Sequence, residues 1–387
     1  MIYDFDTPID RRHSGSEKWR HYPDDVLPLW VADMDFRSPE PVIQALCERV
    51  EHGVFGYGCD PLELREAIVE RLRRLYGWQV APDALVLLPG VARGFHATCR
   101  ALASPGDGVL VQTPVYTPIL DTHIQGRLVN NEVELTRCSD GSYYVDLAAF
   151  ENAITARTRL FMLCNPHNPV GRVFTSHELH GMAEICLRHN VLICSDEIHC
   201  DIVYQGHRHT PIASIAPEIE QQTVTLMSPS KTFNIAGLKL AVAIIPNPEL
   251  RRSMVALLGP LAGPPNILAE AAALAAYRDS QSWLDQVLAY LAANRDFLLQ
   301  FVRTNLPTIS MNSPEATFLA WLDCRQTGIT GSSPSRFFQD KSRVAFNDGA
   351  AFGRGGEGFV RVNFGCPRAT LADALERVRQ ALGSLHV

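Results

Sequence analysis

Ser228-Pro-Ser-Lys-Thr-Phe-Asn-Ile-Ala-Gly-Leu-Lys239 is the most informative segment of the chain. It follows an apolar run, residues 223–227, of the kind found in strands that are covered on both faces. Lys231 therefore lies in a Ser-rich turn at the end of a predicted buried strand. An enclosed lysine near another cation has a lowered amine pKa and can condense with an aldehyde. The alternative is an ordinary solvated lysine in a loop.

The same order of strand and turn recurs along the chain. Apolar runs predict strands at residues 84–88, 108–112, 159–164, 191–195, 223–227 and 240–245. Amphipathic patterns predict helices between several of them, at residues 61–76, 90–103 and 175–189. This alternation predicts an α/β fold with a mostly parallel sheet and helices on both faces.

The pattern changes after about residue 279. A long helix at 281–304 is followed by predicted strands at 308–311, 317–322 and 359–364 and by a closing helix at 370–385. We therefore expect a large domain at residues 51–279 and a small C-terminal α+β domain at residues 280–387. The N-terminal segment, residues 1–50, is expected to pack with the small domain. Its helix is predicted to begin at Ser38-Pro39, with Ser38 as the N-cap.

The composition argues against several classes of protein. The 387 residues are 46% hydrophobic and carry a formal net charge of −7, which gives no reason to expect nucleic acid or a membrane as a partner. No apolar run approaches the roughly 20 residues of a membrane span, and no signal peptide is evident. Ten cysteines without a CxxC pair fit free thiols in the cytoplasm.

Histidine pairs are the only hint of a metal site. His207 and His209 form one pair, and His177 and His180 form another. Neither pair has cysteine or carboxylate ligands beside it at ligand spacing. We therefore predict no metal and expect a surface loop and a helix face.

Three further polar segments also follow predicted strands. In Cys164-Asn-Pro-His-Asn-Pro-Val-Gly171, Asn168 can present its amide to a ligand oxygen, although a plain loop is the alternative. In Cys194-Ser-Asp-Glu-Ile-His199, Asp196 is a candidate partner for a protonated ring nitrogen. Glu197 could have this role instead, or both acids could be solvated. Pro89-Gly-Val-Ala-Arg-Gly94 begins a helix whose free backbone N–H groups can bind a phosphate.

The four segments together predict a cofactor site. Open α/β sheets bind ligands at the carboxyl ends of their strands, where all four segments are expected. A lysine for an aldehyde, an acid for a ring nitrogen and a helix start for a phosphate match pyridoxal 5′-phosphate.

The joint motif resembles a known superfamily. NPHNPVG, SDEIH and SPSKTFNIAGLK are similar, in order and spacing, to motifs of the fold type I pyridoxal-phosphate enzymes. Within that superfamily, WVADMDF at residues 30–36, FGYG at 55–58, DEIH and SKTFNIAGL resemble the MalY/PatB-type cystathionine β-lyases. Those enzymes cleave C–S bonds of cysteine conjugates.

The resemblance implies roles for individual residues. Lys231 would hold the cofactor and move the Cα proton of the substrate. Asp196 would pair with the pyridine nitrogen, and Asn168 with the ring O3′ and the substrate. Tyr116 would stack on the ring, with a core aromatic as the alternative. Arg361 would clamp the substrate α-carboxylate with its two-pronged guanidinium.

The resemblance also implies a phosphate site and a homodimer. The residues expected around the phosphate are Gly90, Val91, Ala92, Ser228, Ser230 and Lys239. Tyr57 would reach the phosphate from the neighbouring subunit, so that the two active sites are shared.

His199 bears on the reaction type. The related aminotransferases commonly carry tyrosine at this position, whereas the lyases share the DEIH form, and no second arginine for a dicarboxylate substrate is evident. The resemblance therefore predicts a β-lyase that converts cystathionine or another cysteine thioether to a thiol, pyruvate and ammonia. The main alternative is an aminotransferase, and the second is a non-catalytic pyridoxal-phosphate-fold regulatory module.

Overall fold

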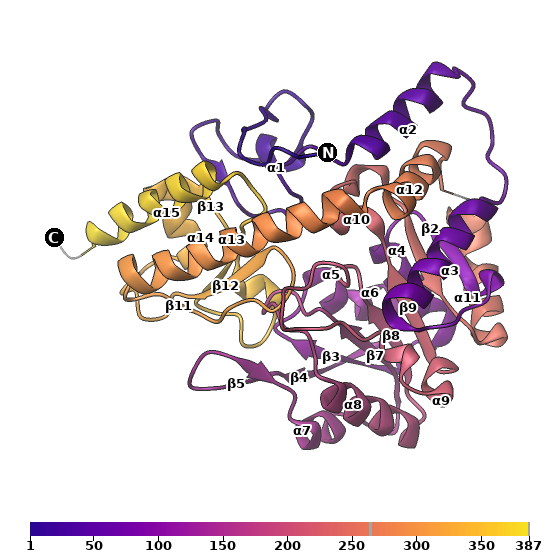
Figure 1. Cartoon of the computed structure of the whole chain (residues 1–387). Helices are drawn as coiled ribbons and strands as arrows, with labels where there is room; N and C mark the ends of the chain where they lie inside the picture. Colours follow the sequence, from indigo (N-terminus) through magenta and orange to yellow (C-terminus); the bar gives the residue numbers. More distant parts are fainter. Residues whose placement is uncertain (263–264, 386–387) are drawn as a thin grey trace.

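A seven-stranded sheet lies at the centre of the larger part of the molecule (Figure 1). The computed structural model describes residues 1–262 and 265–385. The strand order is β2-β10-β9-β8-β7-β3-β4, and only β10 is antiparallel to its neighbours. The predicted mostly parallel sheet is thus confirmed. The strands are β2 (Leu85–Leu88), β3 (Gly108–Thr113), β4 (Val129–Glu134), β7 (Thr158–Cys164), β8 (Leu192–Asp196), β9 (Thr223–Met227) and β10 (Ala241–Ile244).

Helices cover both faces of this sheet because successive side chains of each strand point to opposite sides. In β7, Leu160 and Met162 share a core cluster with Phe95 of α4 (Val91–Leu102). The intervening Phe161 packs with Leu179 of α8 (Ser176–Arg188) on the other face. Three further helices complete the layers: α3 (Leu62–Tyr76), α11 (Pro248–Ala262) and α12 (Ile267–Asp279).

A second sheet lies in the C-terminal part. Its order is β11 (Ser310–Met311), β12 (Leu319–Asp323), β15 (Phe359–Asn363) and β14 (Asn347–Asp348), and every pairing is antiparallel. Two long helices, α13 (Gln281–Asn305) and α15 (Arg368–Gly383), share one hydrophobic cluster with this sheet.

The N-terminal segment joins the same part of the molecule. Its strand β1 (Leu27–Pro28) pairs in parallel with β13 (Val344–Ala345). Phe5 and Phe36 belong to the cluster that contains Trp283 of α13. Domain boundaries near residues 50 and 279 stay a prediction.

The sequence-based expectation for Ser38 is wrong. Helix α2 (Glu40–Glu51) begins after Pro39, and no side chain caps it. The Ser38 hydroxyl instead donates to the backbone carbonyl of Asn234 at 3.0 Å. The Ser38 side chain therefore forms a tertiary hydrogen bond instead of the helix N-cap that local propensity predicts.

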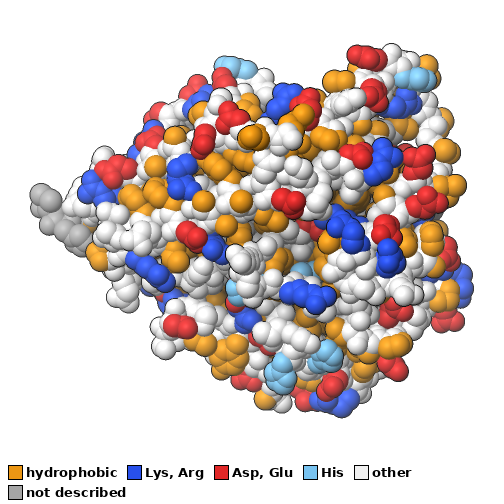
Figure 2. All heavy atoms as spheres, viewed as in Figure 1, with side chains coloured by type: hydrophobic (Ala, Val, Ile, Leu, Met, Phe, Trp, Pro, Cys, Tyr) orange, Lys and Arg blue, Asp and Glu red, His pale blue; other side chains and the backbone are white. Residues whose placement is uncertain are grey.

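The surface carries both signs of charge. On the face that Figure 2 shows, Lys and Arg side chains are interspersed with Asp and Glu. None of the helices within residues 1–262 and 265–385 is long and apolar enough to cross a membrane.

Candidate active site

A cavity of about 570 Å³ lies where several strands of the large sheet end. Because β2, β7, β8 and β9 run in the same direction, the turns that follow them meet at one edge. Arg361 of β15 reaches the cavity from the second sheet. The predicted residues brought together in the lining are Gly90, Val91, Ala92, Tyr116, Asn168, Asp196, His199, Ser230, Lys231, Lys239 and Arg361.

Two predicted residues do not line this cavity. Tyr57 is fully exposed in the connection between α2 and α3. Ser228 is buried, and its hydroxyl donates to the Leu240 carbonyl at 2.6 Å and contacts the Ser230 hydroxyl at 2.6 Å. Within one chain, Ser228 is therefore placed to support Ser230 rather than to contact a ligand.

Lys231 projects from the short helix α10 (Pro229–Thr232), directly after β9. Its Nζ donates to the backbone carbonyl of Ala32 at 2.7 Å. The pKa of the amine is lowered to about 8, mainly by desolvation and also by Arg361, while Asp33 and Asp196 oppose the shift. About a tenth of the amine is therefore neutral and nucleophilic at pH 7, far more than for an ordinary lysine.

Asp196 ends β8, and its carboxyl group faces the cavity. Its Oδ1 accepts a hydrogen bond from the Ile198 N–H at 3.1 Å. Burial raises the pKa of this carboxyl group to about 7, with a smaller contribution in the same direction from Glu197. A buried carboxyl group that accepts few hydrogen bonds from the protein can accept one from a ligand N–H.

Glu197, the alternative to Asp196, points elsewhere. Its buried carboxylate accepts from the Ser195 hydroxyl at 2.9 Å and contacts His209 Nε2 at 2.8 Å. His209 is thus buried rather than on the surface loop expected from sequence. Of the two adjacent acids, the geometry favours Asp196 as the one that meets a ligand.

Arg361 is buried among neutral acceptors. Its Nη1 donates to Asn168 Oδ1 at 3.0 Å, and its Nη2 donates to Asn347 Oδ1 at 2.6 Å and to the Trp30 carbonyl at 2.9 Å. The buried Nε has no hydrogen-bond partner among the residues that the structure describes. Burial lowers the pKa of the guanidinium to about 10. No carboxylate of the described residues pairs with it, so its charge is available to an anionic ligand.

Tyr116 and His199 complete the walls. Tyr116 is 36% exposed, which excludes the core-aromatic alternative, and its backbone N–H donates to the Asn168 carbonyl at 3.1 Å. His199 is buried, and its Nδ1 has no hydrogen-bond partner within the described part of the chain. Burial holds the pKa of His199 well below its ordinary value, so the imidazole is neutral.

The start of α4 is built to receive an anion. Gly90 precedes it with φ of 119°, a backbone conformation that favours glycine. Val91 and Ala92, whose first-turn N–H groups have no partner within the helix, line the cavity together with Lys239 and Ser230. An anion site, an amine with a lowered pKa and a buried acid fit the phosphate, aldehyde and ring nitrogen of pyridoxal phosphate.

Several lining residues have no role in the sequence-based prediction. Trp30 and Ala32 belong to the quoted WVADMDF motif, but they act through backbone carbonyls, which any residue type can supply. Asn347 reaches Arg361 because the two are register partners in β14 and β15. Glu17 comes from the four-residue helix α1 (Glu17–Arg20), which is too short to show a periodic pattern.

Comparisons with known proteins agree with this geometry. The family model for aminotransferase class I and II matches residues 24–378. Cystathionine beta-lyase PatB of Bacillus subtilis (strain 168) is 39% identical, over 98% of this chain and 99% of that protein. The crystal structure of OvoB is 43% identical, with a TM-score of 0.94 over 99% of this chain and 100% of that chain. Cystalysin of Treponema denticola, a structure that contains pyridoxal 5′-phosphate, is 32% identical, with a TM-score of 0.96 over 100% of both chains.

Proposed function

Because the chain belongs to the aminotransferase class I and II family, we propose that it is a pyridoxal 5′-phosphate-dependent C–S β-lyase. Its substrate is L-cystathionine or a related cysteine S-conjugate, and its products are a thiol, pyruvate and ammonia. The observation that carries this proposal is that Lys231, Asp196 and Arg361, from three separate elements, line one cavity. The full-length similarity to PatB supports a lyase over other members of the family.

The cofactor-holding residues follow from the lining. Lys231 would hold the cofactor covalently, Asp196 would pair with its ring nitrogen, and Asn168 with O3′. Tyr116 would stack on the ring. Gly90, Val91, Ala92, Ser230 and Lys239 would surround the phosphate, with Ser228 behind Ser230. When bound, pyridoxal phosphate supplies an aldehyde for amines and a ring that withdraws electrons from the substrate Cα.

The residues of the chain bind the substrate and move its proton. The Arg361 guanidinium pairs with the substrate α-carboxylate. Together with the Asn168 amide, it sets the orientation of the bonds at the substrate Cα. The Lys231 amine accepts the Cα proton. The Ala32 carbonyl limits where that amine can lie by accepting its hydrogen bond. Removal of the proton allows the Cβ–S bond to break, and the sulfur departs as a thiolate that the protonated Lys231 amine can neutralise. Water then converts the remaining three-carbon fragment to pyruvate and ammonia.

Product analysis tests the reaction type. With L-cystathionine as the sole substrate, we expect homocysteine, pyruvate and ammonia in equal amounts and no need for a keto acid. Alanine has no leaving group at Cβ and should give no pyruvate by this route. Thiol release from another cysteine conjugate, with cystathionine inert, would keep the chemistry and change the substrate.

An aminotransferase is the second candidate function. It would use the same lysine, acid and arginine, and the family model that matches the chain is that of aminotransferase class I and II. It would require a keto acid and would release no ammonia, so turnover that depends on a keto acid without thiol release would replace the lyase proposal. Absence of turnover with any amino acid would point to the non-catalytic module.

We also propose that the enzyme is a homodimer with shared active sites. Tyr57 is fully exposed beside the exposed apolar residues Val54 and Phe55, and it lies outside the cavity of its own chain. These features support a contact in which Tyr57 completes the phosphate site of a second copy. The ten free cysteines support a reducing compartment, the cytoplasm. We retain residues 1–50, 51–279 and 280–387 as the proposed division into structural units.

A further inference from the structure

Glu17 is a carboxylate of the cavity lining that the proposed chemistry does not use. Asp196, Lys231, Lys239 and Arg361 account for the ring nitrogen, the aldehyde, the phosphate and the α-carboxylate. Arg93, the other unassigned charge of the lining, lies in the first turn of α4 beside the phosphate residues. Glu17 is therefore the acidic residue of the lining that is left without a partner once the cofactor groups and the amino-acid end of the substrate are assigned.

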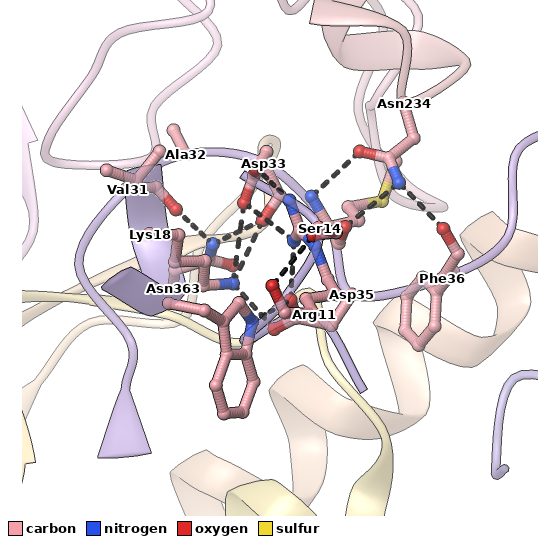
Figure 3. A network of polar contacts seen from close by, with 12 residues as sticks. Arg11, Ser14, Lys18, Val31, Ala32, Asp33, Asp35, Phe36, Asn234 and Asn363 are labelled. Atoms are coloured by element: carbon pink, nitrogen blue, oxygen red, sulfur yellow. Dashed lines mark hydrogen bonds and ion pairs between the residues drawn. The ribbon is translucent and has the colours of Figure 1, made fainter. Parts of the chain in front are cut away.

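The backbone that carries Glu17 is held by a buried ion network, shown in Figure 3. The next residue, Lys18, is completely buried, and its Nζ donates to Asp35 Oδ2 at 2.6 Å. The indole Nε1 of Trp19 donates to Asp35 Oδ1 at 2.8 Å. Arg11 pairs with Asp35 at 2.6 Å and also with Asp33. Helix α1 is thus fixed in place, although the side chain of Glu17 is exposed.

Two aromatic residues, Trp30 and Tyr116, line the same cavity as Glu17. The indole Nε1 of Trp30 donates to the Lys18 carbonyl at 3.1 Å, and Trp30 also lines the cavity. Tyr116 lines the same cavity and is 36% exposed. A carboxylate together with aromatic side chains is the combination that binds organic cations.

We propose that Glu17 and Trp30 form a subsite for a positively charged group on the departing, sulfur-linked half of the substrate. This inference rests on the proposed lyase function and names its substrate class: cysteine S-conjugates whose thiol carries an amine. Arg361 and Lys231 fix the carboxylate and amine of the cysteine half, so the distal group is the one left to meet Glu17. Cystathionine, with an ammonium on its homocysteine half, belongs to this class.

Matched substrates test the subsite in the holoenzyme. S-(2-aminoethyl)-L-cysteine and S-propyl-L-cysteine have the same length, and only the first carries a distal cation. We expect kcat/KM to favour the cationic substrate and Glu17→Gln to reduce that preference about 2- to 5-fold, the size of an exposed charge contact. The value for the propyl substrate should not change. Glu218→Gln, an exposed change in α9 (Pro217–Glu220), is the control and should leave the preference intact.

A binding measurement separates this inference from the proposed function. L-lysine and L-norleucine lack a leaving group at Cβ, and their dissociation constants can be measured by calorimetry whether or not C–S cleavage occurs. Glu17→Gln should weaken L-lysine binding and leave L-norleucine unchanged, and added salt should reduce the wild-type difference. If Glu17→Gln changes the dissociation constants of L-lysine and L-norleucine equally, or changes neither, the proposed cation subsite is wrong even if the enzyme is an active lyase. Discrimination without any C–S cleavage would keep the subsite and reject the lyase.

Discussion

Replacing Arg361 by lysine should weaken the binding of every amino-acid substrate. Burial lowers the pKa of Arg361 from 12.5 to about 10, a difference that corresponds to about 3 kcal/mol. This is the part of the cost of burying the charge that the acceptors Asn168, Asn347 and Trp30 leave uncompensated. A substrate carboxylate that restores this amount would gain about 100-fold in affinity. Lysine keeps the charge but loses the paired planar contact, so we expect about a 10-fold rise in KM.

Inhibition by a pair of unreactive ligands isolates this contact. L-norleucine and pentylamine differ only in the α-carboxylate, so the ratio of their inhibition constants reports what the carboxylate contributes. In the wild type, norleucine should bind up to about 100-fold more tightly, and in Arg361→Lys this ratio should fall to about 10. Arg343→Lys, which changes an exposed arginine paired with Asp25, should leave the ratio unchanged. The same ratio in Arg361→Lys and wild type would refute carboxylate binding by Arg361.

Further predictions concern the cofactor residues. Lys231→Ala should abolish the visible absorption of the holoenzyme and nearly all turnover, and borohydride reduction of the wild type should label Lys231; a pyridoxyl label on another lysine would refute this assignment. Asp196→Asn should retain the cofactor but lose Cα-deuterium exchange, and near-normal exchange would transfer the role to Glu197. In the cofactor-free protein, burial keeps a proton on Asp196 up to pH about 7, whereas the carboxyl group of the unfolded chain ionises near 3.8. The free energy of unfolding of the wild type therefore decreases as the pH rises between these two values. Calorimetry should show the melting temperature of the wild type falling relative to that of Asp196→Asn from pH 5 to pH 8. Tyr57→Phe should weaken cofactor retention, and its hybrids with Lys231→Ala should be more active than the average of the parents; no excess would argue against shared sites.

The candidate site was predictable where strand direction determines which residues meet. Lys231, Asp196 and Asn168 each follow an apolar strand, and parallel strands bring such positions to one edge. Ala32 was not predictable because a backbone carbonyl carries no residue signature. The contact of Asn347 with Arg361 was not predictable either, because it depends on the register of the short antiparallel pair β14 and β15.

The fold shows the same limits. The polar edge strand Val129–Glu134, with the sequence VNNEVE, lacks the apolar run of the central strands and was not predicted. Ser38 was assigned to a helix cap on local propensity, but its partner, Asn234, lies 196 residues away. Interactions between distant segments are outside the reach of local sequence patterns.

The bond from Arg361 to the Trp30 carbonyl joins residues separated by 331 positions. At the usual 5–20 residues per second of synthesis, roughly 15–70 s pass between the emergence of one partner and that of the other. The ion pair between Lys18 and Asp35 spans only 17 positions and can close at the beginning of that interval. The backbone carbonyls of Trp30, Val31 and Asp33 can therefore be held in place before strand β15 is synthesised. Asn363 of that strand then donates to the carbonyls of Val31 and Asp33, so the active site is completed only near the end of translation.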